Sequence, residues 1–275
     1  KAGISLSKYA ASQSDILFAV LGGDIAYENA IPSCYMRYDE WFYHWSKYMR
    51  TSTGHAIPIL TTIGNHEAGG WRKTRSFVPF YFDYFPHQIG IQGVDPSNRR
   101  SYHNHMFGGH TSITILDSYV VTPIIGEQKR WLMDTLDHLN RTAVPNRLAV
   151  YHASAFPAHL SEIRDITSEL RNHYVPLFEQ YDVKAVYEHH YHCLANSHPI
   201  RNGRVDPRGV RYLGQGSWGV SPRKTIDVRW WSDDHASVEH VLYTRCNSID
   251  GCTVQTFAFD QRKGETGVRS TINLA

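Results

Sequence analysis

Seven side chains with metal-binding chemistry follow four apolar runs in this chain. Carboxylate, phenol and amide oxygens bind hard cations, and imidazole binds divalent transition metals. The residues are Asp24 and Tyr27 after run 16–21, Asn65 and His66 after run 58–63, His152 after run 147–151, and His190 and His192 after run 183–187. One such run end could arise by chance, but four in succession predict a metal site.

The motifs at these run ends differ in specificity. Gly-Asp-x-x-Tyr, which ends at Tyr27, is weak by itself, because an Asp after a strand is more often a turn or a helix cap. Gly-Asn-His-Glu is more specific, since the amide oxygen of Asn65 and the imidazole of His66 can face one cleft. His190 and His192 can chelate one metal or bind one each of a pair.

The elements that must position these side chains are short strands alternating with helices. The apolar runs have strand length and are rich in branched and aromatic residues. Helices are predicted over residues 3–13, 36–50, 126–139 and 162–180, the last interrupted at Pro176. This alternation predicts an α/β protein with its site at the carboxyl edge of the sheet.

Other segments predict packing. Trp41, Trp45 and Tyr48 lie at helical spacing and predict a core stripe. The aromatic segment 77–85 is expected to line or roof the cleft. Residues 199–275 alternate β-like segments with turns and predict further strands.

A hairpin is predicted from residues 102–107 and 112–116, which flank two glycines. Alternation along the first strand places His103 and His105 on one face. We expect these two side chains to be structural or to lie at the surface.

Composition suits one large globular domain. The chain has 275 residues, of which 41% are hydrophobic, and its net charge of +2 disfavours nucleic acid or a membrane surface as partner. Its seventeen His fit metal chemistry or an acidic working compartment. No apolar run reaches the ~18 residues of a membrane span. The chain starts at Lys1 without Met or a signal-like segment, as a processed or partly observed polypeptide would.

The four Cys and one sequon fit an oxidising compartment. Cys246 and Cys252 flank a turn-rich loop that a disulfide could close, whereas four free thiols are the alternative. Cys34 and Cys193 lie in loops that would meet if the site assembles as predicted. Asn140 begins a glycosylation sequon, which supports secretion weakly.

The ordered motifs resemble the calcineurin-like metallophosphoesterases, and among them most the purple acid phosphatases. Tyr27 carries the distinction, because related phosphoesterases usually lack a tyrosine there. The resemblance covers most of the chain, including the segments 116–119, 128–132 and 199–203. It implies an α/β fold with a central β-sandwich, built from two βαβαβ halves and flanked by helices.

The resemblance also implies a centre of two metal ions, Fe(III) and a divalent Fe, Zn or Mn. The implied ligands are Asp24 as bridge, Tyr27 and His192 on the first metal, and Asn65, His152 and His190 on the second. A metal-bound hydroxide would attack phosphorus. His66 would stabilise the phosphate oxygens, and His159 would protonate the leaving alcohol.

Three features depart from the family pattern. The family's opening Asp-x-Gly strand, whose Asp is a ligand, is absent from the sequence and by family spacing would lie just before Lys1. We therefore expect residues 1–275 to form a single catalytic domain that is incomplete at its N-terminus. His189 stands where the family has Gly, and would contact substrate or shift the loop. Residues 193–196 replace the acidic or aromatic residues usual there.

These observations predict a secreted or lumenal acid phosphatase acting on phosphomonoesters. One alternative is a catalytically impaired pseudophosphatase, an extracellular interaction protein that assembles with itself or with a partner. Another is a phosphodiesterase, in which segment 77–85 would stack a base or a phenyl ester.

Overall fold

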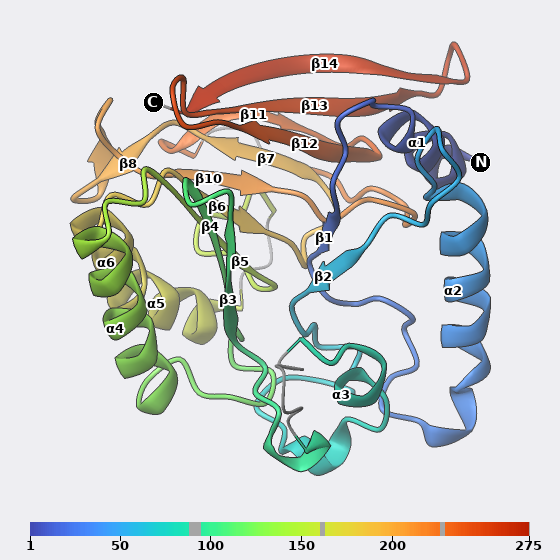
Figure 1. Ribbon diagram of the computed structural model, residues 1–275, viewed down its shortest axis with the longest axis horizontal. Coiled ribbons are helices and arrows are strands. Elements are labelled where there is room, and N and C mark those ends of the chain that lie inside the picture. Colours follow the sequence, from blue (N-terminus) through green and yellow to red (C-terminus); the bar gives the residue numbers. More distant parts are fainter. Residues whose placement is uncertain (88–94, 160–162, 226–228, 275) are drawn as a thin grey trace.

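The computed structural model describes residues 1–87, 95–159, 163–225 and 229–274. Two β layers pack face to face, and helices cover both outer faces (Figure 1). This is the α/β sandwich flanked by helices that the resemblance implies, and it is the fold of its structural neighbours.

The larger layer is a seven-stranded mixed sheet in the order β11-β7-β10-β6-β5-β4-β3. Its four central strands are parallel, and β3, β7 and β11 are antiparallel to their neighbours. The strands are β3 (His103–Phe107), β4 (Thr111–Ile115), β5 (Asn146–Tyr151), β6 (Ala185–Glu188), β7 (Leu194–Ser197), β10 (Arg211–Gly214) and β11 (Ser232–Ala236). The hairpin β3–β4 and the parallel strands confirm the sequence prediction, whereas β7 and β11 were not individually predicted.

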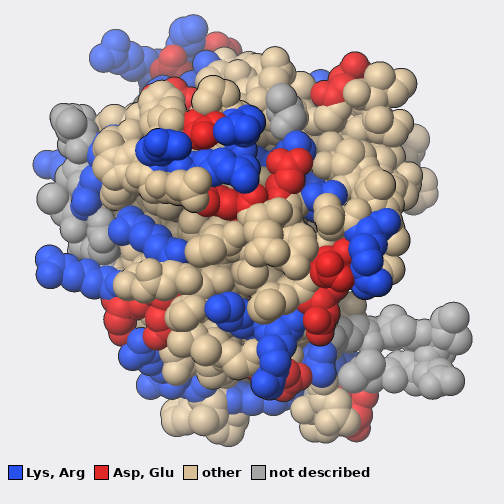
Figure 2. All heavy atoms as spheres, turned by 90° about the vertical axis from the view of Figure 1, so that its left-hand side faces the viewer, with Lys and Arg blue, Asp and Glu red and all other residues tan. Residues whose placement is uncertain are grey.

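Three helices cover the outer face of this sheet: α4 (Glu127–Arg141), α5 (Arg164–His173) and α6 (Val175–Gln180). Their apolar faces pack on the sheet in the main core, with Leu132, Leu136, Leu170 and Phe178 fully buried. Pro176 lies in the first turn of α6, which explains the predicted interruption, because Pro has no N–H to continue α5. Lys and Arg are interspersed with Asp and Glu on the face seen in Figure 2.

The second layer contains a parallel pair, β1 (Ala19–Leu21) and β2 (Ile59–Thr61), and an antiparallel sheet. That sheet comprises β12 (His240–Cys246), β13 (Cys252–Asp260) and β14 (Glu265–Leu274). Branched side chains of both layers form a second core, among them Ile115, Val150 and Val254. α1 (Ala2–Ala11) packs on β12 and β13, and α2 (Met36–Tyr48) packs beside β1 and β2.

The remaining elements are short. They are the 3-10 turns η1 (Pro32–Cys34), η2 (Arg75–Phe77) and η3 (Pro96–Asn98), the helix α3 (Tyr81–Tyr84), and the strand pair β8 (Ile200–Arg201) and β9 (Arg204–Val205). Among the described residues, no helix is long and apolar enough to cross a membrane.

The expectation for the aromatic segment 77–85 was wrong. Tyr81, Phe82 and Phe85 pack into a core cluster with Tyr38 and Val120 and do not roof the cleft. These aromatic side chains are buried against other core residues. A sequence pattern does not distinguish such a position from a cleft wall.

The cysteines divide into one bridge and two thiols. Cys246 and Cys252 form the predicted disulfide between the ends of β12 and β13, with a Cα–Cα distance of 4.1 Å. Cys34 is partly exposed and Cys193 is buried, and both are free.

Candidate metal centre

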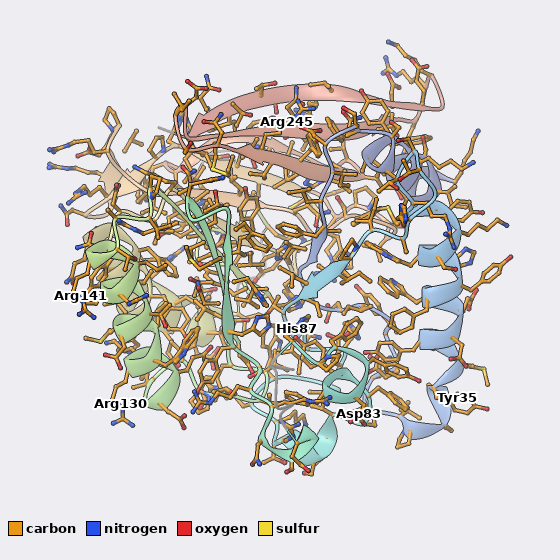
Figure 3. The ribbon with its side chains drawn as sticks, viewed as in Figure 1. Tyr35, Asp83, His87, Arg130, Arg141 and Arg245 are labelled. Carbon is orange, nitrogen blue, oxygen red and sulfur yellow. A yellow bond between two sulfur atoms is a disulfide. The ribbon has the colours of Figure 1, made fainter. Side chains whose placement is uncertain are left out.

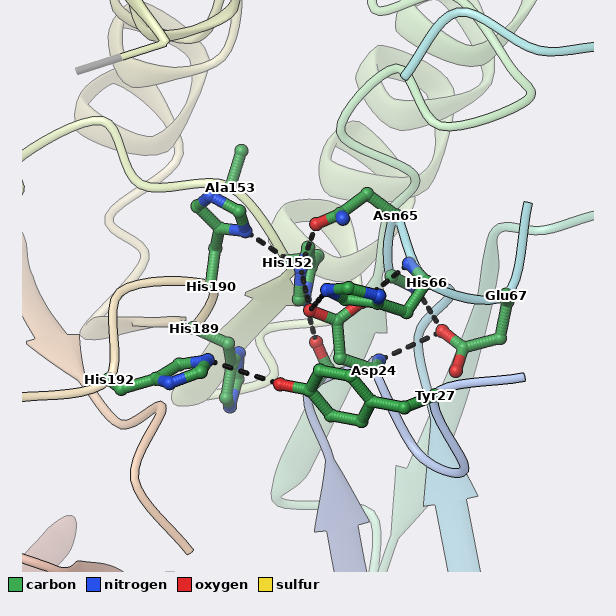
Figure 4. A network of polar contacts seen from close by, with 12 residues as sticks. Asp24, Tyr27, Asn65, His66, Glu67, His152, Ala153, His189, His190 and His192 are labelled. Atoms are coloured by element: carbon green, nitrogen blue, oxygen red, sulfur yellow. Dashed lines mark hydrogen bonds and ion pairs between the residues drawn. The ribbon is translucent and has the colours of Figure 1, made fainter. Parts of the chain in front are cut away.

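The loops that follow β1, β2, β5 and β6 meet in one polar network (Figure 4). The six predicted ligands come from all four loops: Asp24, Tyr27, Asn65, His152, His190 and His192. Parallel strands in each layer end at the same edge, so their polar loops lie together there. This is the carboxyl-edge position that the alternation of strands and helices predicted.

Glycines allow the first two loops to touch through their backbones. Gly23 has a φ of +86°, and a Cβ there would lie 2.4 Å from the nitrogen of Gly64. A Cβ on Gly64 would lie 2.3 Å from the nitrogen of Asp24. Asp24 and Tyr27 themselves adopt the left-handed region, at φ 56° and 55°. Such backbone outliers cluster at functional sites, where surrounding contacts hold them.

A buried carboxylate ties these loops together. The side chain of Glu67 accepts hydrogen bonds from the backbone nitrogens of Asp24 (2.8 Å), Ile25 (2.7 Å) and Gly64 (2.7 Å). Burial, and then the charges of Asp24 and Glu28, raise the pKa of Glu67 well above its usual range. Glu67 therefore positions Asp24 without entering the cluster itself.

His152 lies at the centre of the cluster and has more partners than one neutral imidazole can satisfy. Its Nδ1 donates to the carbonyl of Gly22 at 2.6 Å. Its Nε2 lies 3.1 Å from Asp24 Oδ2 and 3.1 Å from Asn65 Oδ1. His190 Nδ1 is also near this atom, at 3.3 Å. With the ring proton on Nδ1, the Nε2 lone pair would face two acceptor oxygens, and a cation among these atoms would remove the repulsion.

Three ligand atoms, one each from Asp24, His152 and His190, lie within 4.8 Å of one another. Burial raises the pKa of the Asp24 carboxyl, but His152 and the backbone N–H of His66 outweigh it, so this pKa is lower than usual. Burial, and then His152, lower the pKa of His190 to about 3. An ionised carboxylate and a neutral imidazole are the forms that bind metal ions.

Tyr27 and His192 form the other side of the cluster, with the phenol oxygen 3.1 Å from Nε2. Burial, and then the charges of Asp24 and Glu67, raise the pKa of Tyr27. Burial and the charge of Arg223 lower the pKa of His192 to about 4. Tyr27 would thus need a strongly charged cation to bind as phenolate.

His66 stands at the rim. Its backbone N–H donates to Asp24 Oδ1 at 2.8 Å, and its ring lies on that of Tyr27, with 4.1 Å between centroids. The ring also contacts the side-chain oxygen of Asn29. The side chain is 31% exposed, which leaves it accessible to a substrate.

The other two predicted histidines lie differently. His189 is buried, its Nδ1 is 3.0 Å from the carbonyl oxygen of Tyr151, and its ring occupies the space where a Cβ on Gly22 would stand. His159 stacks on Tyr191, with 5.6 Å between ring centroids. His189 also lines the cavity beside the cluster. Its contact with substrate and the catalytic role of His159 both stay predictions.

The sequence did not single out three residues that complete the site. Glu67 is the fourth residue of the Gly-Asn-His-Glu motif, so its position was a usable signal. Trp71 lies edge-on to His190, with 5.2 Å between ring centroids. The charge of Arg223 adds to burial in lowering the pKa of His66 and His192, and it opposes the rise in the pKa of Tyr27. No sequence motif marks this residue.

A cavity of about 790 Å³ adjoins the cluster. Its lining includes Asp24, Tyr27, Arg37, Trp41, His190 and His192. A pocket of this volume suits a small organic molecule.

Known proteins resemble this chain in sequence and in fold. No protein-family model matches the chain. Purple acid phosphatases 15 and 23 of Arabidopsis thaliana are 24% and 25% identical to it, over 67% and 74% of this chain. The Fe(3+)-Zn(2+) purple acid phosphatase 12 of that plant is 23% identical over 66% of it. The structure of purple acid phosphatase PPD1 from yellow lupin seeds superposes with a TM-score of 0.71 and 15% identity, covering 99% of this chain. The chain therefore resembles the purple acid phosphatases in sequence and in fold.

The chain spans less than half the length of these relatives. This purple acid phosphatase-like chain covers 33%, 43% and 37% of those three relatives and 49% of the lupin chain. A second structure, titled GAP50, the anchor in the inner membrane complex of Plasmodium, superposes with a TM-score of 0.67 at 14% identity. There the alignment covers 100% of this chain and 84% of that one.

Proposed function

We propose that the chain forms the catalytic centre of a binuclear metal-dependent acid phosphatase that hydrolyses phosphomonoesters. The observation that carries this proposal is the convergence of donor atoms on His152 Nε2, where an oxygen of Asp24 and the side-chain oxygen of Asn65 each lie at 3.1 Å and Nδ1 of His190 lies at 3.3 Å. The donors fit two metals of different hardness, since a phenol and a carboxylate suit Fe(III), and imidazoles with an amide oxygen suit divalent Fe, Zn or Mn.

The ligands divide as the resemblance implies. Tyr27 and His192 would hold Fe(III), Asn65, His152 and His190 would hold the divalent ion, and Asp24 would bridge them. When bound, the two ions would activate a water and neutralise phosphate charge. His66 and the cation of Arg223 would bind phosphate oxygens, and His159 would donate a proton to the leaving alcohol.

A further ligand for the first metal would come from a strand that precedes this sequence. β1 and β12 each pair with only one neighbour among the described strands. A cavity of about 590 Å³ lies between them, lined by Phe18 and Val20 on one side and Val241 and Tyr243 on the other. An extended segment there could pair with both edges, and this supports the proposed strand.

The proposal includes an oxidising, secreted or lumenal location. The disulfide Cys246–Cys252 supports it, because such bonds persist outside the cytosol. Asn140 is exposed in the last turn of α4, where a glycan could be attached. The phosphodiesterase alternative loses its support, since Tyr81, Phe82 and Phe85 pack in a core cluster and residues 77–85 are not among those that line the cavity beside the centre.

Substitution of the central ligands tests the proposal. Asp24→Asn and His152→Ala should each abolish phosphate release from a phosphomonoester and lower bound metal, while circular dichroism shows an unchanged fold. The matched control is His138→Gln on the exposed face of α4, which should keep wild-type turnover. Unchanged turnover in Asp24→Asn or His152→Ala would contradict the mechanism.

A second candidate is a non-enzymatic interaction protein, a pseudophosphatase. The fit of the whole chain to the structure titled as an anchor in the inner membrane complex of Plasmodium favours it. The two candidates differ in metal content: two metals per chain with phosphate release support the enzyme, whereas a folded chain without a bound metal pair supports the interaction protein.

A further inference from the structure

Three histidines outside the candidate centre form a second cluster. His103 and His105 lie on β3, and His87 follows α3 and lies toward the interior (Figure 3). One ring nitrogen from each lies within 4.8 Å of the others. His103 Nδ1 and His105 Nε2 are 2.8 Å apart, and the ring of His87 lies 4.4 Å from that of His103 between centroids.

The fold holds these rings in place. β3 pairs with β4 so that His103 lies opposite Ile115 and His105 opposite Ile113, which puts both imidazoles on the face of the sheet that packs in the second core. His87 stacks on Phe85, with an angle of 14° between the ring planes. The three side chains therefore meet in an arrangement fixed by strand register and ring packing.

The environment keeps all three imidazoles neutral. Burial lowers the pKa of His87 to about 4 and that of His103 well below its usual range, and it also lowers the pKa of His105. Mutual repulsion adds to burial, because a proton on one ring would disfavour a proton on the next, while a hydrogen bond to the backbone of Thr61 raises the pKa of His103. Neutral imidazoles offer lone pairs, as metal binding requires.

Two of the nitrogens are poorly satisfied. Nε2 of His87 is buried without a hydrogen-bond partner among the described residues, and Nε2 of His103 has none of normal geometry there, although the backbone of Thr61 acts on this ring. Buried polar atoms normally have a partner, and an unpaired one indicates a missing water or ion. The hydrogen bond between His103 and His105 needs one proton, and His87 takes no part in it.

We propose that His87, His103 and His105 bind one divalent transition-metal ion, with zinc as the expected occupant. Three imidazoles and a water form a familiar tetrahedral zinc site, and the partly exposed side of His105 leaves room for the water. No ligand is shared with the cluster around Asp24, so this site exists or fails independently of the proposed phosphatase function.

Zinc content tests the proposal. The full chain, stripped with a chelator and dialysed against Zn²⁺, is compared with the double variant His103→Gln/His105→Gln by elemental analysis. We expect the variant to bind one zinc fewer per chain than the wild type, and the control His138→Gln to match the wild type. Equal zinc content in variant and wild type would overturn the proposal.

A second measurement remains informative if the double variant fails to fold. Asp24→Asn/His152→Ala removes the candidate catalytic centre, and in this background Zn²⁺ should still raise the thermal midpoint, because ligand binding stabilises the folded state. Adding His105→Gln, a change at a partly exposed side chain, should abolish that rise. An equal rise with and without His105, or no rise in either, would contradict a three-histidine site.

Discussion

At the scale of single residues, buried carboxyl groups contact the loops that carry the predicted ligands. The three hydrogen bonds that Glu67 accepts join the loop after β1 to the loop after β2. Glu188 acts similarly on the other side, accepting from the backbone nitrogens of Ala155 and Phe156 and from Tyr151 Oη. Burial raises the pKa of Glu188 to about 7. Buried carboxyl groups thus hold both pairs of loops.

Replacing Glu67 by Gln should destabilise the protein and weaken metal binding. The amide NH₂ would face a backbone N–H, which leaves a buried donor unsatisfied at a cost of about 1–3 kcal/mol. Urea denaturation would measure this loss, and elemental analysis the bound metal. Glu265→Gln, an exposed change at the start of β14, should leave both unchanged. Wild-type stability of Glu67→Gln would show that these hydrogen bonds do not hold the loops.

At the scale of elements, α4 packs on the outer face of the seven-stranded sheet. Leu132, Leu136 and Leu139 on one face are buried, whereas Met133 on the other is 40% exposed. β5, which carries His152 at its end, packs under this helix through Ala149 and Tyr151. The helix therefore stabilises the strand without contacting the centre.

Leu136→Ala should lower the free energy of unfolding by about 2–5 kcal/mol, because it leaves a cavity in the core. Urea denaturation would show the change, and bound metal should stay at the wild-type level below the transition. Met133→Ala is the matched control, with an expected change within about 0.5 kcal/mol. A similar small effect for both variants would mean that α4 is not packed as described.

At the scale of the whole molecule, buried histidines couple folding to pH. His240 joins β12 to the seven-stranded sheet: its Nδ1 is 2.8 Å from Ser217 Oγ and its Nε2 is 3.1 Å from the carbonyl oxygen of Gly214. Burial lowers its pKa to about 4, and Arg269 acts in the same direction, while Asp234 and the two carbonyls of Val238 and Gly214 oppose it. The folded state therefore excludes a proton that the unfolded chain accepts.

Replacing His240 should reduce the dependence of the free energy of unfolding on pH at acidic pH. The unfolded histidine binds a proton below pH 6.5 and the folded one only near pH 4, so the free energy of unfolding falls as the pH falls between these values. One such group contributes about 1.4 kcal/mol per pH unit. Urea denaturation of the chelator-treated protein should show a slope smaller by that amount in His240→Gln. An unchanged slope would exclude this coupling.

The sequence by itself determined much of the site because strand ends are local features. Apolar runs followed by Asp24, Asn65, His152 and His190 predicted the loops that meet, and two-residue alternation predicted that His103 and His105 share a face. The disulfide was also predictable, since its cysteines are only six positions apart in the sequence. These predictions need only backbone geometry over a few residues.

Only the tertiary structure decided which distant groups complete each cluster. Arg223 beside His192, and His87 beside His103, are brought together by crossings of the chain that no local pattern encodes. Tyr81, Phe82 and Phe85 of the aromatic segment 77–85 are buried in a core cluster, although their apolar side chains suit a cleft wall and a core equally. The hydrophobic effect is non-directional, so only the packing of the surrounding elements determines whether such a segment forms a core or a cleft wall.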